Sequence, residues 1–366
     1  MKETIAGNLT RYRKAIDLSQ EQLANLVSVT RQSINNYENA KTLPDSKTLS
    51  ALARTLGVTL DDLLRPESRP VTPFRFRAHA GIDKQPQFAT QVRRMLEIYQ
   101  ALEAAAGIPA YAPETHSCHQ LPGNEALIQA TAARFRRTLG LGETPILNLF
   151  AAVEELGLKV LRQPIATKGF FGLSACSFAQ GAFVLINTHN ISIEQQIFTL
   201  AQEIGHLIFH RDDYQDNLIK LENQGEEGAR EAVANYFAQH LLVPQTEFER
   251  FYQISPNLIQ LKQHFRVSYQ VILKRLSDMG RIDYGREIAK IRKIYKQRNG
   301  LSLSNCIELP PTLKAEDFPE NERYQQLIWQ ALNRGNISEL KAAELLNITL
   351  EELGVRRREA EVYAIP

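Results

Sequence analysis

The segment LSQEQLANLVSVTRQSINNYE, residues 18–38, decides the fold of the N-terminal part of the chain. Apolar residues at three-to-four spacing predict two short helices, one over about 20–26 and one over about 31–37. Ser19 and Thr30 stand where these helices would begin, and both residue types are favourable helix N-caps. Only a tight turn separates the two helices, so the segment predicts a helix-turn-helix.

The second predicted helix has a polar face that could read DNA. Ile34 would pack inward, and the rest of the helix surface carries Arg31, Gln32, Ser33, Asn35 and Asn36. Arg, Gln and Asn can make paired hydrogen bonds to base edges in a major groove. We expect three further residues to hold phosphates: Gln20, Thr30 and Lys41. On polarity alone, however, a solvent-facing helix without a ligand explains this face better.

The whole of residues 4–65 resembles the Xre-type helix-turn-helix family, which includes phage repressors. The matching segments are LSQEQLA (18–24), VTRQSI (29–34), YENAKTLP (37–44) and LSALARTLGV (49–58). Ala40 departs from the family, which usually has glycine there. The resemblance implies a five-helix repressor-like domain that binds double-stranded operator DNA. A homodimer is expected, because one small module buries too little surface for strong specificity and paired half-sites add affinity.

A second motif lies at residues 198–210, FTLAQEIGHLIFH. Zinc peptidases carry His-Glu-x-x-His on a helix because two imidazoles one turn apart reach the same metal and the Glu activates the bound water. Glu203 and His206 fit this pattern, but Gln202 stands where the first histidine belongs. An amide oxygen is a poor substitute for imidazole at zinc. Glu231 opens a later helix and could supply a third, carboxylate ligand.

This region resembles the ImmA/IrrE-type metallopeptidase family. The matching segments are IFTLAQEIGHLIFH (197–210), EAVANYFAQHLLVP (231–244) and HFRVS (264–268). The resemblance implies a zincin-like fold with zinc as cofactor, His206 and Glu231 as metal ligands, and Glu203 as the general base. It also implies that active relatives cut a helix-turn-helix repressor and so relieve repression.

Gln202 leaves three interpretations of this site open. Metal and catalysis are lost, and the fold remains as a sensor or dimerisation domain. Alternatively, Gln202 or His210 substitutes and a weakened zinc site remains. As a third interpretation, the glutamine is an engineered replacement that traps an inactive form. His210 is more simply explained by its place near a helix C-terminus, where a cationic histidine is favourable.

The function of the whole chain has three alternatives of its own. We expect a cytoplasmic, DNA-binding, repressor-like transcriptional regulator whose zincin-like domain senses a small molecule, a protein partner or a metal. A zinc-dependent peptidase that cleaves a helix-turn-helix repressor or itself is the alternative enzyme. An antitoxin-like, partner-binding protein is the third alternative.

The 366 residues predict an α+β, mostly helical protein of several domains. We expect a DNA-binding domain at 1–68, a linker and connecting helix at 69–124, the zincin-like domain with a small sheet at 125–300, and a small helical region at 301–366. Residues 170–187 predict two buried strands, and a proline-rich stretch at 66–73 predicts a linker. The chain shows no internal repeat of fixed period.

Composition narrows the class of protein. The net charge of +2 argues against a protein that coats nucleic acid by bulk charge. The three cysteines lie far apart, which fits a reducing cytosol and not a disulfide scaffold. No secretory signal is expected from the polar N-terminus. The uncharged stretch 169–193 is too polar to predict a membrane span.

Overall fold

The structure is a computed structural model of the 366-residue chain. It describes all residues except 16–17, 57, 59, 65–74, 79–85, 168, 178–179, 215–223, 304–306 and 363–366. The predicted linker at 66–73 therefore lies outside the described residues, as does Ala179 in the predicted turn between the two strands.

The N-terminal domain contains the five predicted helices. They are α1 (Lys2–Ala15), α2 (Gln20–Leu26), α3 (Arg31–Glu38), α4 (Ser46–Leu56) and α5 (Leu60–Leu64). Their common core holds Leu23 and Ala24 of α2, Ile34 of α3 and Leu52 of α4, all buried. The small side chain of Ala24 lets α2 and α3 pack closely, which gives the predicted helix-turn-helix its shape.

A four-stranded sheet forms the centre of the molecule in the order β1-β3-β4-β2. Its strands are β1 (Arg75–Ala78), β2 (Lys159–Gln163), β3 (Gly172–Ser177) and β4 (Gly181–Asn187). The predicted hairpin is confirmed as β3 and β4, which pair antiparallel, while β2 runs parallel to β4. Strand β1 comes from the region expected to be a linker and pairs antiparallel with β3.

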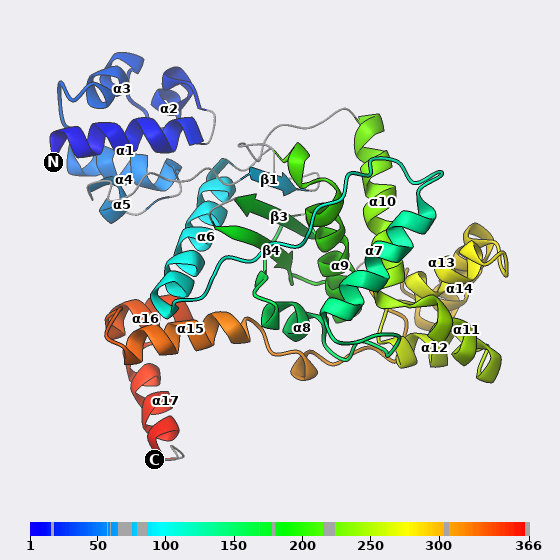
Figure 1. The fold of residues 1–366 in the computed structure, drawn as a ribbon. Coiled ribbons are helices and arrows are strands. Elements are labelled where there is room, and N and C mark those ends of the chain that lie inside the picture. The colour runs from blue at the N-terminus through cyan, green and yellow to red at the C-terminus, as the bar shows by residue number, and fades with distance from the viewer. Residues whose placement is uncertain are drawn as a thin grey trace.

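One face of the sheet packs against four helices. These are α7 (Glu125–Thr138), α8 (Leu149–Glu155), α9 (Ile193–Phe209) and α10 (Gln224–Leu242). Alternate residues of β4, namely Ala182, Val184 and Ile186, join these helices in a single apolar core. Helix α9 lies against β3 and β4, and α10 packs on α9 (Figure 1).

The opposite face of the sheet packs against helices from two distant parts of the chain. These are α6 (Pro86–Ala106), α15 (Glu322–Asn333) and α16 (Glu339–Leu346), followed by α17 (Leu350–Val362). Phe183 and Leu185 of β4 join α6 and α15 in a second core. The expected connecting helix and the expected C-terminal region therefore share one core with the sheet. Helix α6 also contacts α1 and α4 of the N-terminal domain.

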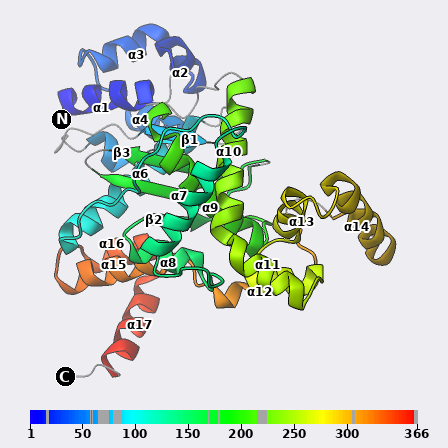
Figure 2. The same ribbon diagram turned by 45° about the vertical axis from the view of Figure 1, so that its right-hand side comes forward.

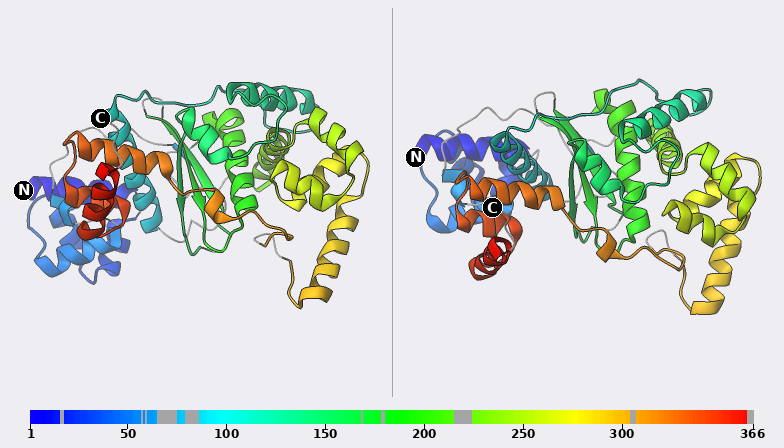
Figure 3. Two further views of the ribbon diagram at one scale, coloured as in Figure 1. Left: turned by 90° about the horizontal axis from the view of Figure 1, so that it is seen from below. Right: turned by 60° about the horizontal axis from the view of Figure 1, so that its bottom comes forward.

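The remaining helices all follow α9 in the chain. They are η1 (Arg211–Asp213), α11 (Gln245–Ile254), α12 (Leu258–Phe265), α13 (Tyr269–Asp278), α14 (Tyr284–Asn299) and η2 (Ala315–Asp317). Figure 3 shows the N-terminal helices at one end, α14 at the other end and the sheet between them. No helix among the described residues is long and apolar enough to cross a membrane.

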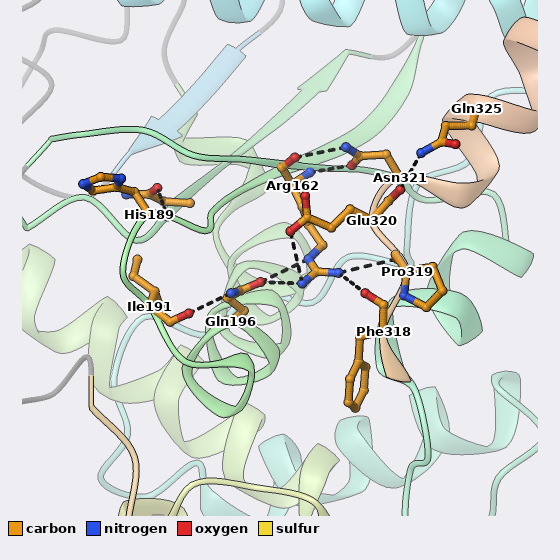
Figure 4. A network of polar contacts seen from close by, with 10 residues as sticks. Arg162, His189, Ile191, Gln196, Phe318, Pro319, Glu320, Asn321 and Gln325 are labelled. Carbon is orange, nitrogen blue, oxygen red and sulfur yellow. Dashed lines mark hydrogen bonds and ion pairs between the residues drawn. The ribbon is translucent and has the colours of Figure 1, made fainter. Parts of the chain in front are cut away.

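A buried arginine fixes the segment before α15 to the edge of the sheet (Figure 4). The Arg162 guanidinium on β2 donates to Oε1 of Gln196 on α9 at 2.8 Å and to the carbonyl of Phe318 at 2.8 Å. Asn321 pairs with the backbone of Arg162, donating to its carbonyl at 3.0 Å and accepting from its N–H at 2.7 Å. The side-chain amide of Asn321 thus satisfies backbone groups on the outer side of the edge strand β2.

Candidate functional site

The polar face of α3 is the first candidate site, and the N-cap of the helix orders its start. Thr30 Oγ1 accepts a hydrogen bond from the Ser33 N–H at 3.1 Å. Arg31 and Gln32 are exposed, whereas Ile34 is buried in the domain core. Gln32 Nε2 donates to Asn36 Oδ1 at 3.1 Å, one turn along the helix. Ser33, Asn35 and Asn36 are partly exposed, so the predicted base-reading residues share an accessible surface.

The three residues expected to hold phosphates differ in their surroundings. Gln20 Nε2 donates to Glu38 Oε2 at 2.7 Å, and Arg13 Nη2 donates to the same oxygen at 2.9 Å. The Gln20 side chain therefore ties the start of α2 to the end of α3. Thr30 caps α3, as described above, and Lys41 is exposed just after α3.

Ala40 explains why the Xre-type family favours glycine at this position. It follows α3 with φ +54°, in the left-handed region that L side chains adopt only at a cost. The next N–H, that of Lys41, donates to the Asn36 carbonyl at 2.8 Å and closes the end of α3.

The second candidate site lies where α9 and α10 come close together. Gly205 on α9 permits this approach, because a Cβ there would lie 3.1 Å from the Ala234 Cα on α10. As a result, Gln202 and His206 of α9 both reach Glu231 of α10. Gln202 Nε2 donates to Glu231 Oε2 at 2.6 Å, and His206 Nε2 lies 3.4 Å from Glu231 Oε1. The three predicted metal-site residues are thus brought together, and we call them the Gln202–His206–Glu231 clasp.

Glu203, the expected general base, is buried beside the clasp. Its Oε2 accepts a hydrogen bond from the Ser174 hydroxyl of β3 at 2.6 Å. The Ser174 hydroxyl also lies 2.6 Å from the Tyr214 hydroxyl, which follows η1. Neither Ser174 nor Tyr214 was identified from the sequence, because they are far from Glu203 along the chain and belong to no local motif.

His210 orients the ring of His206. Its Nε2 lies 2.9 Å from the Cys118 carbonyl, which can only accept, so this nitrogen is the donor. In neutral His210, Nδ1 is then an acceptor, and it lies 2.9 Å from His206 Nδ1. This chain of contacts directs His206 Nε2 toward Glu231. Both ring nitrogens of His210 are engaged in these contacts, which does not favour His210 as a substitute ligand.

The donor set of the clasp does not fit the zinc site that the family resemblance implies. Zinc in catalytic sites takes imidazole, thiolate or carboxylate ligands. The clasp has one imidazole, one carboxylate and an amide whose N–H donates to that carboxylate. Among the described residues, no group of three His, Cys, Asp or Glu side chains is arranged to hold a metal ion.

A cleft of about 670 Å³ opens next to the clasp. Phe198 of α9 and Asn235 of α10, one turn from Gln202 and Glu231 respectively, lie in its wall. Lys274 and Asp278 of α13 and Tyr284 of α14 line the far side. This volume lies within the range of small-molecule sites, and its lining offers both aromatic surface and charged groups.

Comparison with known proteins agrees with both resemblances. Residues 9–63 match the helix-turn-helix family model, and residues 153–277 match the model of the IrrE N-terminal-like domain. Two relatives are helix-turn-helix transcriptional regulators of Bacillus subtilis (strain 168). The SPbeta prophage-derived YonR is 40% identical over 57 residues, which are 16% of this chain and 53% of the relative. YqaE is 39% identical over 61 residues, 17% of this chain and 53% of the relative.

The chain spans about half the length of these two curated relatives. The two family matches fall on the two candidate sites: α2 and α3 lie within residues 9–63, and the whole clasp lies within residues 153–277. The chain therefore combines an Xre-type helix-turn-helix domain with a metallopeptidase-like domain of the ImmA/IrrE type.

Proposed function

We propose that this chain is a repressor-like transcriptional regulator that binds operator DNA through α3. The observation that carries the proposal is the accessible face of Gln32, Asn35 and Asn36 on a helix whose opposite side is held by the buried Ile34. Side chains on a fixed helix can form paired hydrogen bonds with base edges at low entropic cost. The helix-turn-helix regulators among the relatives support the same assignment.

The ImmA/IrrE-type domain is the sensing part of the regulator in this proposal. Helix α6 packs against the sheet on one side and contacts α1 and α4 on the other. A small molecule or protein partner that binds the cleft and prefers one placement of α6 would shift the arrangement of the DNA-binding domain.

The Gln202–His206–Glu231 clasp acts in this sensing domain without catalysis. The Gln202 amide donates a hydrogen bond to one oxygen of the Glu231 carboxylate at 2.6 Å, so that oxygen is already engaged. Gln202 is therefore a degenerate metal-ligand position, and we propose no peptide cleavage by this chain.

DNA binding is tested by fluorescence anisotropy of the full chain with a duplex from its own upstream region. Gln32→Ala and Asn36→Ala should each weaken specific binding by about 1–3 kcal/mol, because each removes the side chain of one base contact. Binding to unrelated duplexes should change little. Asn299→Ala on α14, an exposed asparagine at the far end of the molecule, is the matched control. Parent-like operator binding by both α3 variants would contradict the proposal.

The degenerate site is tested by zinc analysis of the purified chain. We expect the parent to hold little zinc and Gln202→His to bind it more tightly, by about tenfold or more, because a second imidazole is gained. Gln195→His on the same helix is the control, since it adds an imidazole outside the clasp. Near-stoichiometric zinc in the parent that is lost in Glu231→Ala would instead favour the peptidase.

A further inference from the structure

The C-terminal helices α16 and α17 form a second helix-turn-helix. The segment SELKAAELLNITLEELGVRR, residues 338–357, aligns without gaps with SQEQLANLVSVTRQSINNYE, residues 19–38. Few positions are identical, so a search for a fixed period does not reveal this repeat. The backbone and the caps reveal it.

The turns of the two units have the same backbone. Ser28 and Asn347 occupy equivalent positions with φ +57° and +54°. The following N–H groups, of Val29 and Ile348, donate five residues back at 2.9 and 3.0 Å, to the carbonyls of an alanine in each unit. The same left-handed residue and the same closing hydrogen bond therefore join the two helices in both units.

The caps of the two units also correspond. Ser338 begins α16 as Ser19 begins α2, each accepting from the backbone N–H three residues later at 3.2 and 3.1 Å. Thr349 begins α17 as Thr30 begins α3, and both hydroxyls accept from the N–H three residues later at 3.1 Å. The positions of the core agree as well: the pair Leu23 and Ala24 corresponds to Ala342 and Ala343, and Ile34 corresponds to Leu353, all buried.

One side-chain contact between the helices recurs with different chemistry. In the N-terminal unit, Gln20 donates to Glu38 at 2.7 Å. In the C-terminal unit, the equivalent residues are Glu339 and Arg357, and Arg357 Nη1 donates to Glu339 Oε1 at 3.0 Å. The two units thus share a shape and an inter-helix tie.

Their exposed faces differ. Where α3 has Arg31, Gln32, Asn35 and Asn36, α17 has Leu350, Glu351, Gly354 and Val355. Leu350 and Val355 are 51% and 41% exposed. At the positions equivalent to those of α3, this face lacks Arg, Gln and Asn side chains, and Glu351 and Glu352 place two carboxylates where the first turn would meet phosphates. The face therefore favours a protein partner over DNA.

The same face is complementary to itself. Glu351, Val355 and Arg358 follow one another at i, i+4 and i+7, so they lie on one side of α17. An antiparallel copy of this helix places Glu351 opposite Arg358 of the partner subunit, with Gly354 opposite Val355 of the partner subunit. Gly354 costs helix stability but leaves room at the centre, since a Cβ there would meet only Arg358 Nη1, at 3.6 Å. Helix α17 leads away from the rest of the molecule in Figures 1 and 2, so a second copy can reach it.

We propose that α17 of this second helix-turn-helix is the surface on which two copies of the chain associate. The contact is antiparallel and isologous, with Val355 at its centre and a Glu351–Arg358 ion pair at each end. It assigns a surface to the dimer expected for the proposed regulator, but it does not depend on DNA binding.

The test is sedimentation equilibrium of the full chain without DNA. Arg358→Glu and Glu351→Arg should each weaken the dimer by about tenfold, because each replaces two attractive pairs by two repulsive ones. The double variant Glu351→Arg/Arg358→Glu should restore most of the affinity, since the pairs form again with exchanged charges. Glu351 and Arg358 are both exposed, so we expect these substitutions to leave the fold intact. Arg298→Glu on α14, an equally exposed arginine, is the control for a change in net charge.

A monomeric parent would overturn the proposal, as would single variants that behave like Arg298→Glu. A role of α17 on DNA gives a different pattern: an unchanged dimer, weaker DNA binding in Arg358→Glu and stronger DNA binding in Glu351→Arg. That pattern would also overturn it. Failure of the proposed function would give a different result: the chain would still form the dimer but would not bind operator DNA.

Discussion

Replacing Glu103 by glutamine should loosen the attachment of α6 to the sheet. Glu103 lies between two cations, with Oε2 2.9 Å from Lys159 Nζ on β2 and Oε1 2.6 Å from Arg323 Nη2 on α15. The side chains of Glu103 and Lys159 are 3% and 1% exposed, so water cannot replace the lost partner. Burial already lowers the pKa of Lys159, and Glu103 opposes that effect.

The expected cost follows from this burial. Removing one partner of a buried ion pair leaves an uncompensated charge and costs about 3–5 kcal/mol. With a urea dependence of about 2 kcal/mol per molar, the unfolding midpoint would fall by about 1.5–2.5 M. The combined Glu103→Gln/Lys159→Met variant should recover part of the loss, because a buried cation is removed with its partner.

Tryptophan fluorescence provides the assay. The chain has one tryptophan, Trp329 on α15, which packs against the core shared by α6, α15 and the sheet. Urea unfolding followed by this signal therefore reports on the elements that Glu103 joins. Glu97→Gln, an exposed position on the same helix, should change stability by less than about 0.5 kcal/mol. A Glu103→Gln midpoint equal to that of the Glu97→Gln control would refute the reasoning.

Three further predictions concern other parts of the chain. Ala40→Gly should raise the stability of the N-terminal domain by about 0.5–1 kcal/mol in thermal unfolding, because it relieves a left-handed alanine; a lower melting temperature would contradict this. Burial raises the pKa of Glu154 to about 7, so its charged form destabilises the fold as pH rises from about 4.5 through 7. Glu154→Gln should therefore be more stable than the parent at pH 8 but not at pH 4. The same difference in stability between variant and parent at both pH values would contradict this prediction. Gly205→Ala should cost about 1–3 kcal/mol in urea unfolding, because its Cβ would lie 3.1 Å from Ala234 Cα and Phe237 Cδ1; an unchanged midpoint would show that α9 and α10 can separate freely.

Local sequence rules predicted the elements well. The N-caps Ser19 and Thr30 and the spacing of apolar residues placed α2 and α3 within a residue of their observed ends. The motif segment 197–210 falls on α9 apart from His210. The later helix predicted to carry Glu231 is α10, which begins earlier, at Gln224. These signals succeed because capping and amphipathic periodicity act over a few residues.

Contacts between distant segments could not be predicted in the same way. Strand β1 alternates charged and apolar residues in RFRA, but it is only four residues long and lies just after proline-rich sequence, so the alternation is too short to mark it as a strand. The hydrogen bond between Ser174 and Glu203 joins residues on different elements. In the clasp, the family motif predicted which residues meet, but the direction of the Gln202 amide toward Glu231 depends on the packing of α9 against α10.

The position of α6 has a practical consequence for dividing the chain into fragments. A fragment that starts at the expected boundary of residue 125 would lack α6 and leave Phe183 and Leu185 of β4 without much of their cover. Freshly exposed apolar strand surface promotes aggregation. A fragment that starts at residue 75 keeps both α6 and β1, which pairs with the edge of β3, so we expect that fragment to remain in solution when produced alone.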